Sequence, residues 1–101
     1  MIVTVRQCLD TVAVEFAIGW RELAGNSRSR SVSRPRHVAM WLALRSGRNV
    51  SEIGRVCGGR DATTVRHGVG QVEERRAGDH EFRRLTDRLL ATIEAKTTEA
   101  A

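Results

Sequence analysis

The feature that most constrains the fold is a pair of glycines, Gly58 and Gly59, with Asp61 shortly after them. Because glycine lacks a Cβ atom, the pair can adopt backbone conformations that other residues avoid, which predicts a sharp turn. The carboxylate of Asp61 can accept hydrogen bonds from free amides two or three residues later, which predicts the start of a helix. Apolar residues at helical spacing lie before the turn in residues 50–57 and after it in residues 65–72. Together these signals indicate a helix-turn-helix, with an ordinary αα-hairpin as the alternative.

In a helix-turn-helix the N-terminal residues of the second helix face base edges in the major groove of DNA. Those positions are held here by Asp61, Ala62, Thr63 and Thr64. They are therefore the first candidates for residues that read a DNA sequence.

Positive charge in this 101-residue chain comes almost entirely from arginine. Seventeen Lys+Arg against twelve Asp+Glu give a net charge of +5 and a pI near 10.9, and Lys96 is the one lysine. The planar guanidinium group suits phosphates and guanine edges in a way that an ammonium group does not. A high-GC genome also favours arginine, so the placement of the arginines carries more weight than their number.

Arginines alternate with small polar residues over residues 26–36, and we expect no apolar face in the first half of this segment. The pattern predicts a flexible basic loop that neutralises phosphates or inserts an arginine into a minor groove, with a solvated linker as the alternative. Ser33 is predicted to cap a helix over residues 34–45, with Pro35 in its first turn and Arg36 on its solvent side. The arginines of the segment are Arg28, Arg30, Arg34 and Arg36.

Periodic apolar residues predict further helices, and no strand pattern or internal repeat is present. Asn49 and Glu52 have the spacing of a capping box, and Gly54 indicates a close approach between helices. The predicted helices cover residues 2–17, 20–23, 34–45, 50–57, 61–77 and 80–96. Ile2 begins the apolar stripe of the first helix. Asp79 is expected to cap the last helix, whose apolar stripe is Phe82, Leu85, Leu89 and Ile93. We therefore predict an all-α fold with a single domain over residues 1–96 and a flexible tail over residues 97–101.

Other classes of function find little support in the sequence. Cys8 and Cys57 lie far apart without a nearby set of ligands, so we expect buried thiols in a reduced cytoplasmic protein and no metal site. The three histidines, among them His67, lack a partner at a spacing that would suit catalysis, so we expect no enzyme. Trp20 is expected to close the core with Leu23, with stacking on a ligand as the alternative. No apolar run could cross a membrane, and no secretion signal is present.

With both segments placed, the chain resembles the C-terminal DNA-binding domain of the bacterial replication initiator DnaA. The match rests on residues 29–32, 34–36, 39–40 and 52–54 and above all on Gly-Gly-Arg-Asp-x-Thr-Thr-Val at residues 58–65. It covers residues 5–93. The resemblance implies a Trp-repressor-like helical bundle that recognises a short, asymmetric site of the DnaA-box type in double-stranded DNA.

The resemblance also implies residue roles. Arg28 matches the arginine that enters the minor groove, and Thr64 lies among the residues that meet bases and backbone in the major groove. Histidine is usual in the family where Ala62 stands, and proline is frequent where Ser51 stands, so Ala62 predicts a relaxed or shifted specificity. The full set of expected DNA contacts is Arg28, Arg30, Arg34, Arg36, Val50, Ser51, Arg60, Asp61, Ala62, Thr63, Thr64, Arg66 and His67.

The sequence lacks the Gly-x-x-x-x-Gly-Lys-Ser/Thr phosphate loop that an ATP-dependent initiator needs. We therefore expect a stand-alone DNA-binding module in the cytoplasm, associated with the nucleoid, that uses no nucleotide and no cofactor. It would modulate replication initiation or act as a small transcription regulator. The alternative is a protein-interaction adaptor that kept the fold and lost base reading, for which Ala62 is the evidence.

Overall fold

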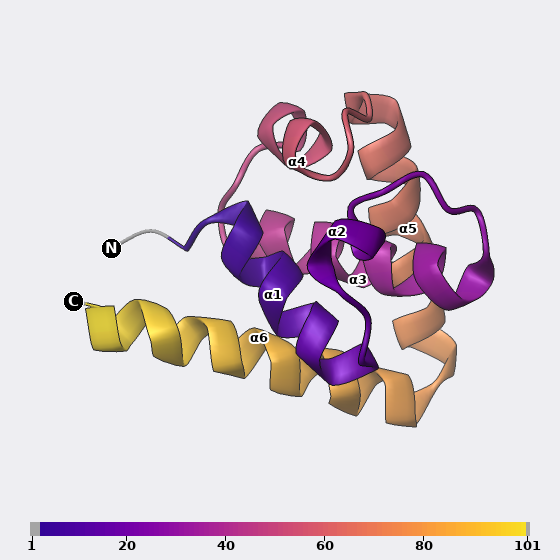
Figure 1. The fold of residues 1–101 in the computed structure, drawn as a ribbon. Helices are drawn as coiled ribbons and strands as arrows, with labels where there is room; N and C mark the ends of the chain where they lie inside the picture. The colour runs from indigo at the N-terminus through magenta and orange to yellow at the C-terminus, as the bar shows by residue number, and fades with distance from the viewer. Residues whose placement is uncertain (1–2, 101) are drawn as a thin grey trace.

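The computed structural model describes the backbone of residues 3–100 and the side chains of residues 3–96. This part of the chain forms six helices and no strand (Figure 1). The helices are α1 Val5–Phe16, α2 Trp20–Leu23, α3 Arg30–Arg45, α4 Val50–Val56, α5 Ala62–Gly78 and α6 His80–Ala100. The all-α fold with a helix-turn-helix is thus confirmed, and α4 and α5 form that motif.

Helix α3 is the centre of the bundle and packs against each of the other five helices. Its second half is buried almost all round, with Trp41, Leu42 and Ala43 fully inaccessible to solvent. A helix that is apolar on every side belongs in a core, and the other helices cover it. Figure 1 shows α6 beside α1 on the opposite side of the bundle from α4, so α6 packs on α5 and leaves α4 uncovered.

Helix α1 begins later than the apolar pattern predicts. Its N-cap is Thr4, whose hydroxyl accepts a hydrogen bond from the amide of Gln7, while the Gln7 side chain accepts one from the Thr4 amide at 2.8 Å. This capping box satisfies two free amides, so the helix starts at Val5 and the predicted start at residue 2 is wrong. Ile2, which we counted in the apolar stripe, lies outside the described residues.

Helix α3 begins earlier than predicted. Its N-cap is Ser29 and its first residue is Arg30, so Pro35 lies inside the helix and Ser33 is not the cap. The reason is an inward-facing stripe that the local pattern does not reveal: Val32, Pro35 and Arg36 are all buried. Burying Val32 requires a helical turn before the proline, and Pro35 removes just one backbone hydrogen bond from it.

The α6 stripe is confirmed, with Phe82, Leu89 and Ile93 buried, and Asp79 caps the helix by accepting from the Phe82 amide at 3.0 Å. Helix α6 runs to Ala100. The single domain over residues 1–96 and the flexibility of residues 97–101 stay predictions, and residue 101 and the side chains of residues 97–100 lie outside the described part.

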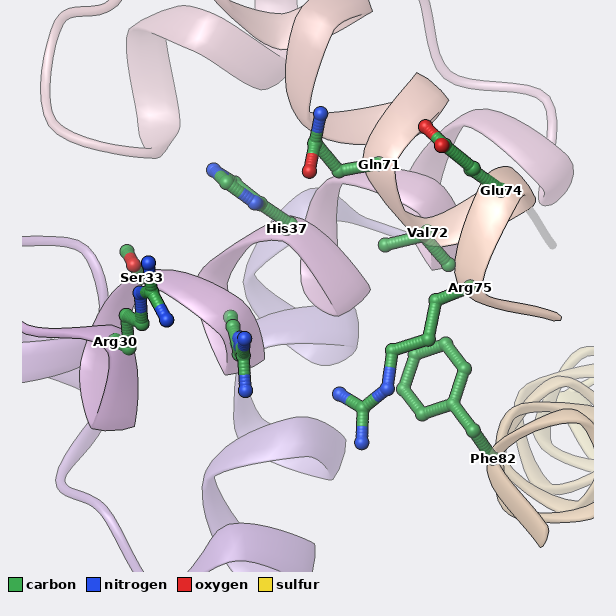
Figure 2. A pocket seen from close by; sticks show the side chains of 9 residues that line it. Arg30, Ser33, His37, Gln71, Val72, Glu74, Arg75 and Phe82 are labelled. Carbon is green, nitrogen blue, oxygen red and sulfur yellow. The ribbon is translucent and has the colours of Figure 1, made fainter. Parts of the chain in front are cut away.

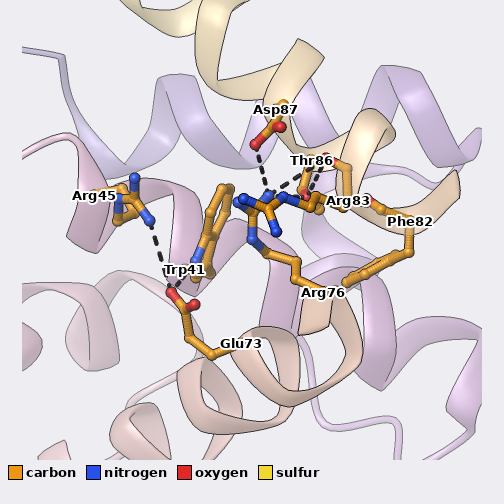
Figure 3. A network of polar contacts seen from close by, with 8 residues as sticks. All are labelled: Trp41, Arg45, Glu73, Arg76, Phe82, Arg83, Thr86 and Asp87. Carbon is orange, nitrogen blue, oxygen red and sulfur yellow. Dashed lines mark hydrogen bonds and ion pairs between the residues drawn. The ribbon is translucent and has the colours of Figure 1, made fainter. Parts of the chain in front are cut away.

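A polar network ties α3, α5 and α6 together around the ring of Trp41 (Figure 3). The indole N–H donates to Glu73 at 2.6 Å, and the guanidinium of Arg76 lies 4.7 Å from the ring centroid. Arg76 also donates to Thr86 at 2.5 Å and to Asp87 at 2.8 Å. These contacts hold the second half of α5 against α3 and α6.

Smaller expectations at the core are also settled. Cys8 and Cys57 are buried free thiols, and burial raises the pKa of each to about 11. Leu23 is fully buried, whereas Trp20 is half-buried and lies under the guanidinium of Arg6, 3.4 Å from its ring centroid. Leu23 is thus part of the core as expected, whereas Trp20 lies outside the core cluster and stacks on a cation.

Candidate nucleic-acid interface

The turn between α4 and α5 has the geometry that its two glycines predict. Gly58 and Gly59 have φ values of 89° and 73°, in the left-handed region that glycine adopts at no steric cost. A Cβ atom on Gly58 would lie 2.3 Å from the carbonyl oxygen of Ala24, so a side chain is also excluded by a neighbouring segment. The turn therefore lies directly against the end of α2.

The two helix starts of the motif are capped. Asp61 accepts a hydrogen bond from the Thr64 amide at 2.8 Å, as predicted, and this bond is the main cause of the lowered pKa of Asp61. Asn49 accepts from the Glu52 amide at 2.9 Å. The predicted capping box is wrong in its second half, because the Glu52 carboxylate pairs with Arg48 at 2.5 Å.

The first two turns of α5 present a polar face to solvent. Val65 is fully buried, and Gly68 packs so close to α3 that a Cβ atom there would lie 2.8 Å from the His37 ring. These two inward positions fix the rotation of the helix. The side chains that it turns outward are those of Thr63, Thr64, Arg66 and His67, with Asp61 exposed before them and Ala62 half-buried. Five of the predicted contacts are thus brought together with Ala62 at one helix start.

The first turn of α4 belongs to the same candidate interface. Val50 is half-buried and Ser51 is exposed at its first turn. Gly54 allows α4 to approach the turn closely, since a Cβ atom there would lie 2.0 Å from the carbonyl oxygen of Arg60. The expected close approach at Gly54 is confirmed, and its partner is the backbone just before α5.

Residues 24–29, between α2 and α3, form a loop that we call the arm. The side chains of Arg28 in the arm and of Arg30 and Arg34 in α3 are exposed and form no hydrogen bond or ion pair within the described residues. Arg30 and Arg34 line a groove of about 560 Å³ between α3 and α5, and Figure 2 shows the Arg75 side chain reaching into it across the ring of Phe82. Guanidinium groups without an internal partner thus lie along the arm and along the first turns of α3.

Arg36 and Arg60 are not among these free cations. Arg36 is 3 % exposed and donates to the carbonyl of Leu23 at 2.7 Å, so the expectation that its side chain faces solvent is wrong. Burial lowers the pKa of its guanidinium, and nearby Arg60 lowers it further. Arg60 is half-buried and donates to backbone carbonyls, including that of Gly25 at 2.6 Å. Charge patterning could not show this, because it counts arginines without their internal acceptors.

His37 of α3 and His67 of α5 meet edge to face, with ring centroids 6.5 Å apart. Burial lowers the pKa of His37, and the neighbouring Arg36 and His67 lower it further. No group of three or more His, Cys, Asp or Glu side chains that could hold a metal ion occurs in the described part of the chain. Within the same residues, no helix is long and apolar enough to cross a membrane.

Comparison with known proteins identifies this arrangement. The protein-family model described as the bacterial DnaA protein helix-turn-helix matches residues 5–72, which is more than half of the chain. The chain belongs to this family. The resemblance noted in the sequence is therefore confirmed, and the chain is a DnaA-type helix-turn-helix domain, a DNA-binding class of domain. These 101 residues contain this domain without the ATPase domain of the initiator.

Several relatives show the same relation. The chromosomal replication initiator protein DnaA of Cereibacter sphaeroides is 42% identical over 81 residues, which are 79% of this chain and 18% of that protein. DnaA of Ruegeria sp. is 38% identical over 94 residues, which are 92% of this chain and 20% of that protein. A crystal structure of a DNA replication initiation factor superposes with a TM-score of 0.82 at 27% identity, covering 91% of this chain and 28% of that one. The chain thus spans about a fifth of the DnaA sequences that it matches.

Proposed function

We propose that this DnaA-type domain binds double-stranded DNA specifically at a DnaA-box-like sequence. The first turns of α5 enter the major groove, and Arg28 of the arm enters the adjacent minor groove. The observation that supports this most is the position of the arm, whose base lies against the turn that starts α5. One duplex can therefore meet both elements together. The domain acts without nucleotide hydrolysis and modulates replication initiation or transcription.

Phosphate contacts supply much of the binding energy in this proposal. Arg30 and Arg34 are four residues apart on α3, so they lie on the same face of the helix. Both guanidinium groups are exposed and without a partner among the described residues, and so is that of Arg28. Each is available to neutralise a phosphate or to enter a groove, which costs no internal ion pair. The amides at the start of α4, at Val50 and Ser51, add a position for backbone contacts.

Base reading depends on the exposed residues of α5. The hydroxyl groups of Thr63 and Thr64 and the longer side chains of Arg66 and His67 can reach base edges or backbone. Ala62 offers a methyl group, which can touch a thymine methyl but cannot donate a hydrogen bond. The proposed binding is therefore less selective than that of a relative with histidine at position 62. Arg66 can in addition shift the preferred sequence toward guanine.

Titration of a labelled DnaA-box duplex and a scrambled duplex, each at two salt concentrations, tests the proposal. We expect tighter binding of the box duplex and a slope of log K against log salt of about −2, from the two phosphates that Arg30 and Arg34 neutralise. Equal affinity for the two duplexes would favour the second candidate, an adaptor that lost base reading, for which Ala62 is the observation. No binding to either duplex would refute the proposal.

Two substitutions test the reading face. Arg28→Ala and Thr64→Ala should each weaken specific binding by about 1–3 kcal/mol, because each removes one groove contact. Both side chains are exposed, so the helical content measured by circular dichroism should stay at the wild-type level. Arg84→Ala is the matched control, since Arg84 is exposed on α6 and outside the proposed interface. Undiminished binding in both variants would show that the reading face lies elsewhere.

A further inference from the structure

Three consecutive backbone carbonyls at the base of the arm are held by two arginine side chains. The Nε of Arg36 donates to the carbonyl of Leu23 at 2.7 Å, and Nη1 and Nη2 of Arg60 donate to the carbonyls of Ala24 and Gly25 at 3.4 and 2.6 Å. Carbonyls at the end of a helix lack partners within the helix, so these contacts satisfy groups that would otherwise need water. We call the three carbonyls and two guanidinium groups the arm clamp.

The Arg60 end of the clamp is fixed to the helix-turn-helix. The Arg60 amide donates to the carbonyl of Gly54 in α4 at 2.8 Å, and its guanidinium also donates to the carbonyl of Cys57 at the end of that helix. The residue after Arg60 is Asp61, the N-cap of α5. In Figure 1 the loop after α2 passes close to the turn between α4 and α5. The clamp therefore connects the arm directly to the residue before the reading helix.

The other end of the arm is fixed as well. Ser29 is the N-cap of α3, and its amide donates to the Ser27 hydroxyl at 3.2 Å. Just three residues separate Gly25 in the clamp from Ser29, and Arg28 is one of them. A segment of this length with both ends held has little freedom to move independently of α5.

We propose that Arg60, assisted by Arg36, is a positioning residue that sets the place of Arg28 relative to the first turn of α5. The minor-groove contact and the major-groove contacts are then coupled through the clamp rather than made by independent parts. This inference rests on the proposed DNA binding for its consequence, and on the clamp contacts alone for its mechanical part. Arg60 thus acts on DNA recognition through Arg28 and not through a phosphate.

The chemistry of the clamp makes lysine a discriminating substitution. A guanidinium group is planar and donates from several nitrogens in a fixed fork, so Arg60 reaches two arm carbonyls and one α4 carbonyl together. The ammonium group of lysine keeps the charge and loses the fork. Arg60→Lys therefore tests geometry at constant charge, and Arg84→Lys at an exposed position of α6 is the matched control.

The mechanical part can be tested without DNA. A nitroxide spin label is attached to Asn26→Cys in the arm, which is feasible because Cys8 and Cys57 are fully buried. We expect the label to become more mobile in Arg60→Lys and in Arg36→Lys, and to keep its wild-type spectrum in Arg84→Lys. Each spectrum is recorded below the melting temperature of its variant. An arm label with unchanged mobility in both clamp variants would overturn the proposal.

The coupling to recognition is measured on two box duplexes that differ in the flank facing Arg28, one A·T and one G·C. We expect the wild type to prefer the A·T flank by about tenfold, because a narrow minor groove attracts arginine. Arg28→Ala and Arg60→Lys should each abolish this preference for the A·T flank, and the double variant should bind the A·T-flanked duplex no more weakly than the weaker single variant. If the losses of affinity for that duplex multiply in the double variant, the coupling is refuted. If the wild type binds neither duplex, the proposed function fails and the spin-label result still decides the clamp.

Discussion

Two glycine-to-alanine substitutions should change stability in opposite directions, although both glycines lie inside helices. Gly70 lies in α5, and a Cβ atom there would meet nothing within 4 Å. Gly54 lies in α4, and a Cβ atom there would be 2.0 Å from the carbonyl oxygen of Arg60 and 3.3 Å from a methyl carbon of Val65. The same chemical change therefore meets open space in one helix and a backbone atom in the other.

The magnitudes follow from these distances. Alanine is favoured over glycine in a helix by about 1 kcal/mol, so Gly70→Ala should raise the free energy of unfolding by about that amount. In Gly54→Ala the turn must move by about 1 Å, which costs roughly 1–3 kcal/mol of overpacking. It also loses the hydrogen bond from the Arg60 amide to the Gly54 carbonyl, worth about 1 kcal/mol. After the helix gain, the net loss is about 2 kcal/mol.

Thermal unfolding followed by circular dichroism measures both effects. For a domain of this size, 1 kcal/mol corresponds to roughly 4–8 °C in Tm. We expect Gly70→Ala to melt about 4–8 °C higher than the wild type and Gly54→Ala roughly 8–16 °C lower. Equal shifts of the same sign in the two variants would refute the reasoning, because the close contact at Gly54 would then carry no energetic weight.

Three further predictions concern specificity, nucleotides and thiols. Ala62→His should sharpen the preference for a box duplex over a scrambled one by about 1–3 kcal/mol with little change in the salt slope, as measured by titration. Calorimetry with ATP at micromolar protein should show no saturable binding, because Asp61 would repel a phosphate at the start of α5; a saturable isotherm would contradict this. The thiols of Cys8 and Cys57 have a pKa raised from 9.0 to about 11, so their contribution to stability is complete below pH 9 and lost as pH rises through 11. Denaturant unfolding at pH 8 and pH 10.5 should show that loss, and Cys→Ala variants should lack it.

The sequence predicted the parts of the fold whose signals are local. Asp61, Asn49 and Asp79 were each recognised as caps, and each accepts a hydrogen bond from an amide three residues later. The turn was predicted because two consecutive glycines favour the left-handed backbone conformation, and both Gly58 and Gly59 adopt it. In each case the information lies within a few neighbouring residues.

The errors arose where a residue's environment is set by distant parts of the chain. Arg36 was expected to face solvent, but its acceptor is the carbonyl of Leu23, thirteen residues away. Pro35 was expected in the first turn of α3, but burial of Val32 against the bundle extends the helix ahead of it. Neither acceptor nor burial can be read from local composition, because both depend on how α2 and α3 pack.

The most distinctive run of residues in the chain serves the scaffold before it serves recognition. Gly58 makes room for the Ala24 carbonyl, Arg60 holds the base of the arm, and Asp61 caps α5. These tasks fix how the reading helix and the arm stand relative to one another, whichever DNA sequence is read. In the function that we propose, preference among sequences depends instead on the exposed side chains that follow and on Arg28. A chain can therefore retain this turn and still differ in specificity, and we propose that Ala62 is the position where this domain does so.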